Sequence, residues 1–181
     1  MQTNPDDLGA VHPSSGRPDA IELLKDDHRR IEKLFSEYEA LRGKGGNAGQ
    51  SGDRQRIAQL AQQVAAELSI HAQLEETLFY PALQQATGDA RGVEQAHHDH
   101  DAAKRLLKDL SSLAPGDGGF DSTMTSLAKA VREHVRMEEE TLFTEARGRL
   151  DAQAIGAQLD DLRRKIESPP EKPEDFVVMG N

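Results

Sequence analysis

The 181-residue sequence contains no cysteine and no tryptophan, and aromatic residues make up only 4% of it. Without thiols, the chain has no disulfide scaffold, no thiolate zinc site, no iron–sulfur ligation and no cysteine nucleophile. Aromatic residues favour strands, whereas the leucine and alanine that dominate the apolar set here favour helices. These scarcities predict an all-α protein.

Positive charge is also scarce, because 22 Lys and Arg residues are set against 32 Asp and Glu, for a net charge of −10. Repulsion from a phosphate backbone argues against nucleic acid as a partner. No apolar run has the length of a membrane span, and the N-terminus does not resemble a signal peptide. We therefore expect a soluble, cytoplasmic protein with no membrane partner. The sequence identifies no protein partner.

Proline and glycine mark the two ends of the chain. Residues 1–18 are polar and rich in Gly, Pro and Ser, which predicts a disordered leader. Residues 168–181 contain three prolines and predict an extended, Pro-rich tail. The domain between them is expected to span residues 19–167.

Apolar residues within this domain recur at alternating steps of three and four, the pattern of helices with one buried face. Pro81 is expected to kink the second helix or to start a new turn in it. Four long helices with short links predict an antiparallel up-down-up-down four-helix bundle, followed by a short additional C-terminal helix. The expected helices are residues 19–42, 53–86, 93–113, from a cap at Asp121 or Ser122 to about 148, and 151–166.

Polar residues interrupt the inward-facing stripes at regular places. Four of the seven histidines fall one to a helix: His28, His71, His100 and His134. Two of them have a glutamate four residues later, in the pairs His71 with Glu75 and His134 with Glu138. Four residues turn a helix by about 400°, so each pair shares a face. Glu76 and Glu139 are about 140° away from those histidines and are expected to face outward or sideways.

The two halves of the domain repeat this order of a lone histidine followed by His-x-x-x-Glu. A Thr-Leu-Phe sequence follows each His-x-x-x-Glu, at residues 77–79 and 141–143, with the offset differing by one residue. Two helical hairpins related by a pseudo-twofold axis would bring all six side chains to one level of the core.

Burying six such side chains is costly unless something compensates them. Two divalent metals would do so, with imidazole nitrogens as terminal ligands and two carboxylates as bridges. A sulfur-free donor set suits iron, manganese or zinc, and iron where redox chemistry is needed. The alternative is that these residues only line a polar seam or form ordinary pairs on helix surfaces.

Three further side chains lie close to this pattern. His97 precedes His100 by three residues and is either a further ligand or a supporting or boundary histidine. Tyr38 and Tyr80 are candidates for positions near the centre, although an aromatic residue on a core stripe is usually there for packing.

At these residues the chain resembles the hemerythrin-like, or HHE, cation-binding family, over about residues 21–166. The segments that carry the resemblance are residues 24–28, 71–81, the helix around His100, and 134–143. The resemblance implies a non-haem di-iron site in an antiparallel bundle, with the iron pair oxo- or hydroxo-bridged. It makes the four histidines terminal ligands and the two glutamates bridges: His28, His71, His100, His134, Glu75 and Glu138.

The sequence departs from the oxygen-carrying members of that family in two places. Those proteins have His-x-x-x-His in the third helix, but Ala96 stands four residues before His100. Their fourth helix has His-x-x-x-x-Asp, which would select Glu139 here, whereas helical phase favours Glu138. The missing histidine argues against a simple reversible oxygen carrier and leaves one metal more open.

Three functions follow as hypotheses. The first is a di-iron protein that binds, senses or processes O2 or a related small oxidant, so that its partner is a diatomic or peroxide ligand. The second is a peroxide-decomposing or nitric-oxide-reducing enzyme at the same centre. The third is a zinc-loaded or metal-poor regulatory bundle.

Overall fold

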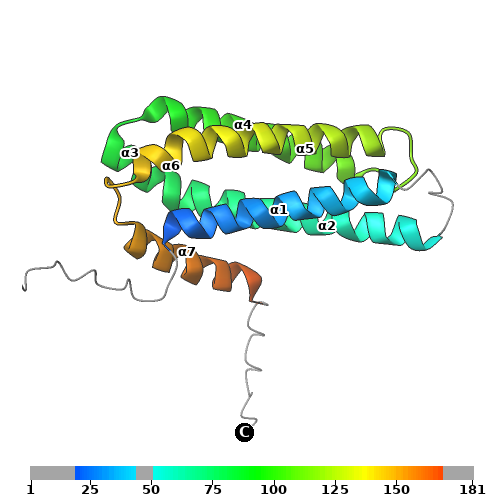
Figure 1. Cartoon of the computed structure of the whole chain (residues 1–181), viewed down its shortest axis with the longest axis horizontal. Coiled ribbons are helices and arrows are strands. Elements are labelled where there is room, and N and C mark those ends of the chain that lie inside the picture. The colour runs from blue at the N-terminus through cyan, green and yellow to red at the C-terminus, as the bar shows by residue number, and fades with distance from the viewer. Residues whose placement is uncertain (1–18, 44–50, 169–181) are drawn as a thin grey trace, which may run out of the picture.

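The computed structural model describes residues 19–43 and 51–168, and every regular element in these two segments is a helix. Two antiparallel hairpins, α1 with α2 and α4 with α5, lie side by side (Figure 1). Their bounds are α1 Ala20–Gly43, α2 Ser51–Leu74, α4 Ala90–Ser111 and α5 Phe120–Met137. The prediction of an all-α four-helix bundle is thus confirmed. The predicted leader, the segment 44–50 and the tail from residue 169 lie outside the described residues.

Two helices that were expected to be continuous each contain a π-helical turn. In the first half, η1 (Glu75–Phe79) follows α2 and leads into α3 (Tyr80–Thr87). In the second half, η2 (Glu138–Leu142) follows α5 and leads into α6 (Phe143–Ala146). Each π turn begins at one of the two glutamates in the predicted metal site, consistent with the frequent occurrence of such turns at functional sites.

The beginning of α4 differs from the prediction. The Asp89 carboxylate accepts hydrogen bonds from the backbone N–H groups of Arg91 and Gly92, so the helix begins at Ala90 instead of Val93. This cap satisfies N–H groups that a helix start leaves without partners.

The expected cap of α5 at Asp121 or Ser122 is wrong. Gly119, with a φ of 104°, occupies the capping position, a backbone conformation that glycine adopts at little cost. The Asp121 carboxylate instead accepts a hydrogen bond of 2.6 Å from the Tyr38 hydroxyl. Tyr38, from the other hairpin, therefore binds the side chain that the local sequence favours as a cap.

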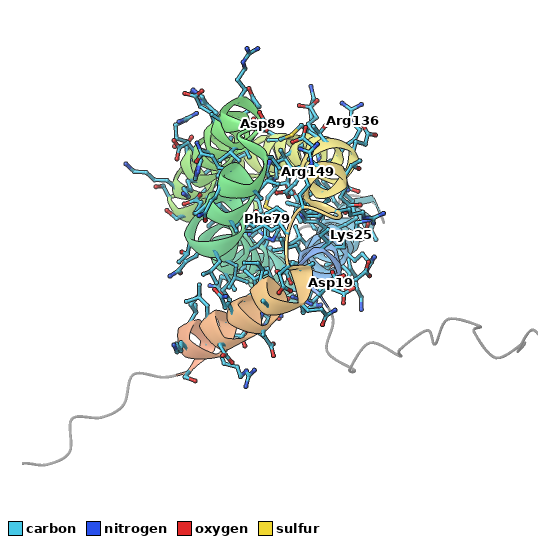
Figure 2. All side chains as sticks on the ribbon, turned by 90° about the vertical axis from the view of Figure 1, so that its left-hand side faces the viewer. Asp19, Lys25, Phe79, Asp89, Arg136 and Arg149 are labelled. Carbon is cyan, nitrogen blue, oxygen red and sulfur yellow. The ribbon has the colours of Figure 1, made fainter. Side chains whose placement is uncertain are left out.

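The core consists of two apolar clusters with a layer of polar side chains between them. One cluster is centred on Phe35, Leu60 and Leu127. The other is centred on Leu24, Phe79 and Phe143. Viewed from one end of the bundle, Phe79 lies inside it, whereas Asp89 and Arg136 lie at its periphery (Figure 2).

The additional C-terminal helix, α7 (Ala152–Glu167), packs outside the four-helix bundle against α1 and α2 (Figure 1). The Asp151 carboxylate caps it by accepting a hydrogen bond of 3.0 Å from the Ala154 N–H. Leu159 is buried in the second apolar cluster, so α7 covers the part of that cluster that α1 and α2 leave open.

Candidate metal centre

The six side chains of the predicted site lie together between the two apolar clusters. They come from α1, α2, η1, α4, α5 and η2, and none is more than 6% exposed. Phe79 and Phe143 from the repeated Thr-Leu-Phe segments also meet here, with ring centroids 5.4 Å apart. The second of these rings stacks on His28. The internal repeat thus corresponds to a pseudo-twofold arrangement of the site.

The four histidines form two pairs. The ring centroids of His28 and His71, on the first hairpin, are 4.8 Å apart. Those of His100 and His134, on the second hairpin, are 4.7 Å apart. The His71 and His100 centroids are separated by 6.3 Å, so the pairs are distinct but adjacent.

Each glutamate contacts one histidine of each pair. Glu75 Oε2 lies 3.1 Å from His71 Nε2 and 3.3 Å from His100 Nε2. Glu138 Oε2 lies 3.3 Å from His28 Nε2 and 3.6 Å from His134 Nε2. Two carboxylates shared between two imidazole pairs have the connectivity of two bridges between two metals.

Several of these buried atoms have no hydrogen-bond partner among the residues that the structure describes. They include Nε2 of His28 and of His71, Oε1 of Glu75 and both carboxylate oxygens of Glu138. Buried polar atoms are normally satisfied, and leaving them unsatisfied costs free energy. Metal ions would satisfy them, and the donor set of imidazole and carboxylate fits a divalent transition metal.

The donor atoms fall into two overlapping groups, within each of which all atoms lie within 4.8 Å of one another. The groups are His71, Glu75, His100, His134 and His28, His71, Glu75, Glu138. Together they contain all six residues named from the sequence.

A second carboxylate faces the outer nitrogen, Nδ1, of every histidine. The four pairs are Glu139 with His28 at 2.8 Å, Glu76 with His100 at 2.8 Å, Asp99 with His134 at 3.5 Å and Asp27 with His71 at 3.6 Å. The carboxylates hydrogen-bonded to Nδ1 of His28 and His100 favour the proton there and leave Nε2 free to bind a metal. At His71 and His134 the carboxylate is more distant from Nδ1.

These supporting carboxylates were not identified from the sequence. Glu76 and Glu139 were expected to face outward or sideways, and they do lie sideways, half-buried against the histidines. The signal was present, because both halves contain an Asp-His dipeptide (Asp27 and Asp99) and a Glu-Glu dipeptide. Each aspartate supports a histidine of its own hairpin, whereas each second glutamate reaches across to the other hairpin.

The two aspartates have different surroundings. Asp27 is 1% exposed and binds the guanidinium groups of Arg30 and of Arg163, the latter from α7. The Asp99 side chain is 30% exposed and accepts a hydrogen bond of 2.8 Å from the Gln95 amide. Burial opposes ionisation of Asp27, but hydrogen bonding to His71 and the two arginines outweigh it and lower the pKa of this carboxyl.

The two central carboxyls differ in electrostatic environment. Burial, together with the neighbouring Glu138, raises the pKa of Glu75 well above its usual range. Burial also opposes ionisation of Glu138, but the adjacent His28 and the other imidazoles lower its pKa. Two carboxylates this close do not both ionise readily without cations, so the metal-free site favours one proton on Glu75.

Tyr80 lies at the centre. Its place on a core stripe had left open whether it would lie there or only pack in the core. Its buried hydroxyl donates to Glu75 Oε2 at 3.1 Å and is 3.4 Å from His100 Nε2. Burial and the nearby carboxylates raise the pKa of Tyr80, so this hydroxyl keeps its proton.

The other two side chains near the pattern lie outside the centre. Tyr38 belongs to the first apolar cluster. His97 is exposed, packs against the Tyr80 ring and lies outside both donor groups.

Comparison with known proteins agrees with this geometry. The family model of the hemerythrin HHE cation-binding domain matches residues 19–146. The chain belongs to this family. Membership and the buried histidine–glutamate cluster together indicate a metal-binding site in this HHE domain. Helix α7 lies beyond the matched residues.

Two similar proteins place the HHE domain in context. It is 29% identical over 132 residues to a protein from Nostoc sp. named DNA nickase, an alignment that covers 73% of the chain and 34% of that protein. The chain thus spans about a third of the length of this relative. Its fold matches the crystal structure of an HHE cation-binding domain-containing protein from Mycobacterium kansasii, with a TM-score of 0.64, 20% identity and coverage of 82% of this chain and 89% of the other.

Among the described residues of the HHE domain, no helix is both long enough and apolar enough to cross a lipid bilayer.

Proposed function

We propose that this chain is a non-haem di-iron protein that binds, senses or processes dioxygen or a related small oxidant. The observation that carries the proposal is the sharing of Glu75 and Glu138 between two histidine pairs. The four histidines and the two glutamates would hold the iron. Such a set is free of sulfur and suits iron, with manganese and zinc as alternatives.

Iron bound at this centre would supply redox chemistry and a Lewis acid. The protein residues have other tasks. The outer carboxylates orient the imidazoles, and the apolar clusters on either side keep bulk water from the layer between them. The Tyr80 hydroxyl donates a hydrogen bond of 3.1 Å to Glu75 Oε2 and so holds that carboxylate in place.

Anaerobic loading with ferrous iron tests the proposal. The full chain is expected to bind two irons and to change its near-ultraviolet absorption when air or peroxide is admitted. Glu140→Ala is a matched control, because this exposed glutamate follows the two others in η2 but belongs to neither donor group. Binding of far fewer than two irons, or zinc alone in protein from native-like expression, would contradict the proposal.

A second candidate is decomposition of peroxide or reduction of nitric oxide at the same centre. Ala96 supplies no further ligand, which would leave a position open for an external ligand, and the Tyr80 hydroxyl lies beside the six donor side chains. Oxygen evolution from peroxide that is lost in Glu75→Ala would support this candidate. Equal rates with metal-free and iron-loaded protein would exclude it.

The name of the Nostoc protein does not support DNA cleavage by this chain. The alignment covers 34% of that protein, and the net charge of −10 opposes binding to a phosphate backbone.

A further inference from the structure

A cavity of about 220 Å³ adjoins the second half of the centre, between α2, α4 and α5. His71, His100 and His134 form part of its lining, whereas Glu75 and Glu138 do not line it. The cavity is therefore separate from the space between the carboxylates and imidazoles, where the metals would sit. It is a space next to the centre, bounded on one side by three of the four histidines.

The rest of the wall is largely aliphatic. Its apolar side chains come from all four long helices and include Ile31, Leu68, Ala103, Leu107, Val131 and Val135. Aliphatic walls favour an occupant with apolar surface, because such surface is more stable there than in water.

The charged side chains of the lining are partnered within the protein. Lys104 Nζ lies 2.7 and 3.0 Å from the two Glu76 oxygens, and Glu76 also contacts His100. Asp99 accepts a hydrogen bond from Gln95 and faces His134. The charged groups of the wall thus already have partners within the protein, which favours an uncharged ligand.

We propose that this cavity binds a small uncharged organic molecule of about the size of one aromatic ring, beside the His100 and His134 half. An aliphatic cavity of about 150 Å³ is large enough for benzene, whereas a water-sized molecule occupies roughly 30 Å³ in the liquid. A diatomic ligand alone would leave most of the cavity empty. The inference rests on the cavity itself and adds an organic ligand to the small oxidant of the proposed function.

Fluorobenzene is the probe, observed by fluorine NMR with the full chain as isolated. We expect saturable binding, and stronger broadening of the fluorine signal in ferrous-loaded than in zinc-loaded protein, because a paramagnetic metal would lie next to the probe. This comparison needs no variant. Absence of saturable binding would overturn the proposal. Equal broadening with the two metals would also overturn it, provided that metal analysis shows two irons bound in the ferrous-loaded protein.

A pair of variants locates the binding site. Ala103→Phe fills the cavity and is expected to weaken fluorobenzene binding at least about tenfold, a difference of about 1.4 kcal/mol. Ala58→Phe places the same ring in a separate apolar pocket nearer Phe120 and is expected to leave binding unchanged. Metal counts and circular dichroism check that both variants fold. Equal affinities in the two variants would contradict the assignment.

The outcomes separate this inference from the proposed function. Failure to bind two irons, with fluorobenzene still bound by the zinc-loaded chain, refutes the di-iron function and retains the organic-ligand site. Two reactive irons without fluorobenzene binding support the di-iron function and refute the organic-ligand site.

Discussion

The two halves of the centre have matching inner donors but different surroundings. In the first half, Asp27 behind His71 is fully buried and held by two arginines, one of them from α7. In the second half, Asp99 behind His134 is partly exposed and has only a neutral hydrogen-bond donor, Gln95, in addition to the histidine.

The spaces that reach the two halves differ in the same way. The largely aliphatic cavity of about 220 Å³ adjoins the second half. The first half adjoins a cleft of about 290 Å³ where His28 lies among charged side chains, including Arg132, Arg136 and Glu140. A repeated ligand pattern can therefore have two halves in unlike environments, with ion pairs behind the first and an apolar cavity beside the second.

The largest effect is expected from the shared carboxylates. Glu138→Ala removes a donor common to both halves and is expected to lose at least one metal, with an affinity loss well beyond the roughly 10–100-fold typical of a supporting residue. Glu139→Ala is expected to keep both metals and to show a loss within that range, because Glu139 contacts the outer nitrogen of His28. Metal analysis of the two variants side by side measures the difference. A fully loaded Glu138→Ala with a stripped Glu139→Ala would reverse the assignment of the bridge.

The choice between these two glutamates shows how far the sequence was informative. The four-residue step from His134 selected Glu138, which is fully buried in the centre. The same helical geometry did not anticipate that a π turn begins at that residue, because hydrogen bonding from i to i+5 depends on what the surrounding helices require. Glu139 then reaches His28 on α1, a contact made only in three dimensions.

The fold was more predictable than the details of its helix ends. Apolar periodicity is a local property, and it was sufficient for the four-helix bundle and the additional helix. The cap at Asp121 failed because Tyr38, distant in sequence, binds that carboxylate. Likewise, no local pattern connects Arg163 on α7 to Asp27 on α1, although the repeated Asp-His dipeptide was a signal that could have identified the aspartates themselves.

The next largest effect is expected from substitution of the two aspartates. Asp27→Asn removes the buried anion that pairs with the exposed Arg30 and the half-buried Arg163, and it weakens the support of His71. We expect about tenfold or greater loss of affinity for one metal and a melting temperature lowered by several degrees. Asp99→Asn is expected to change both quantities less, since this side chain is partly exposed. Calorimetry and metal titration measure the melting temperature and the metal affinity of the two variants. A larger effect from Asp99→Asn would refute the proposal that the first half depends more strongly on its aspartate.

A smaller effect is expected from α7. Arg163→Met keeps the apolar part of the side chain against α1 but removes a cation from Asp27. We expect a few-fold weakening of one metal and little change in the other. Arg164→Met is the control, because the ion pairs of this neighbouring arginine within residues 19–43 and 51–168 are with Asp160 and Asp161 on the surface of α7. Identical metal affinities for the two variants would show that α7 acts only as a cover.

The central claim is that two metals lie in two linked halves of one site. Anomalous diffraction at the iron edge, from crystals of the iron-loaded full chain, tests it most directly. We predict two peaks, one bound by His28 and His71 and the other by His100 and His134, with Glu75 and Glu138 contacting both. A single peak, or peaks away from these six side chains, would contradict the account.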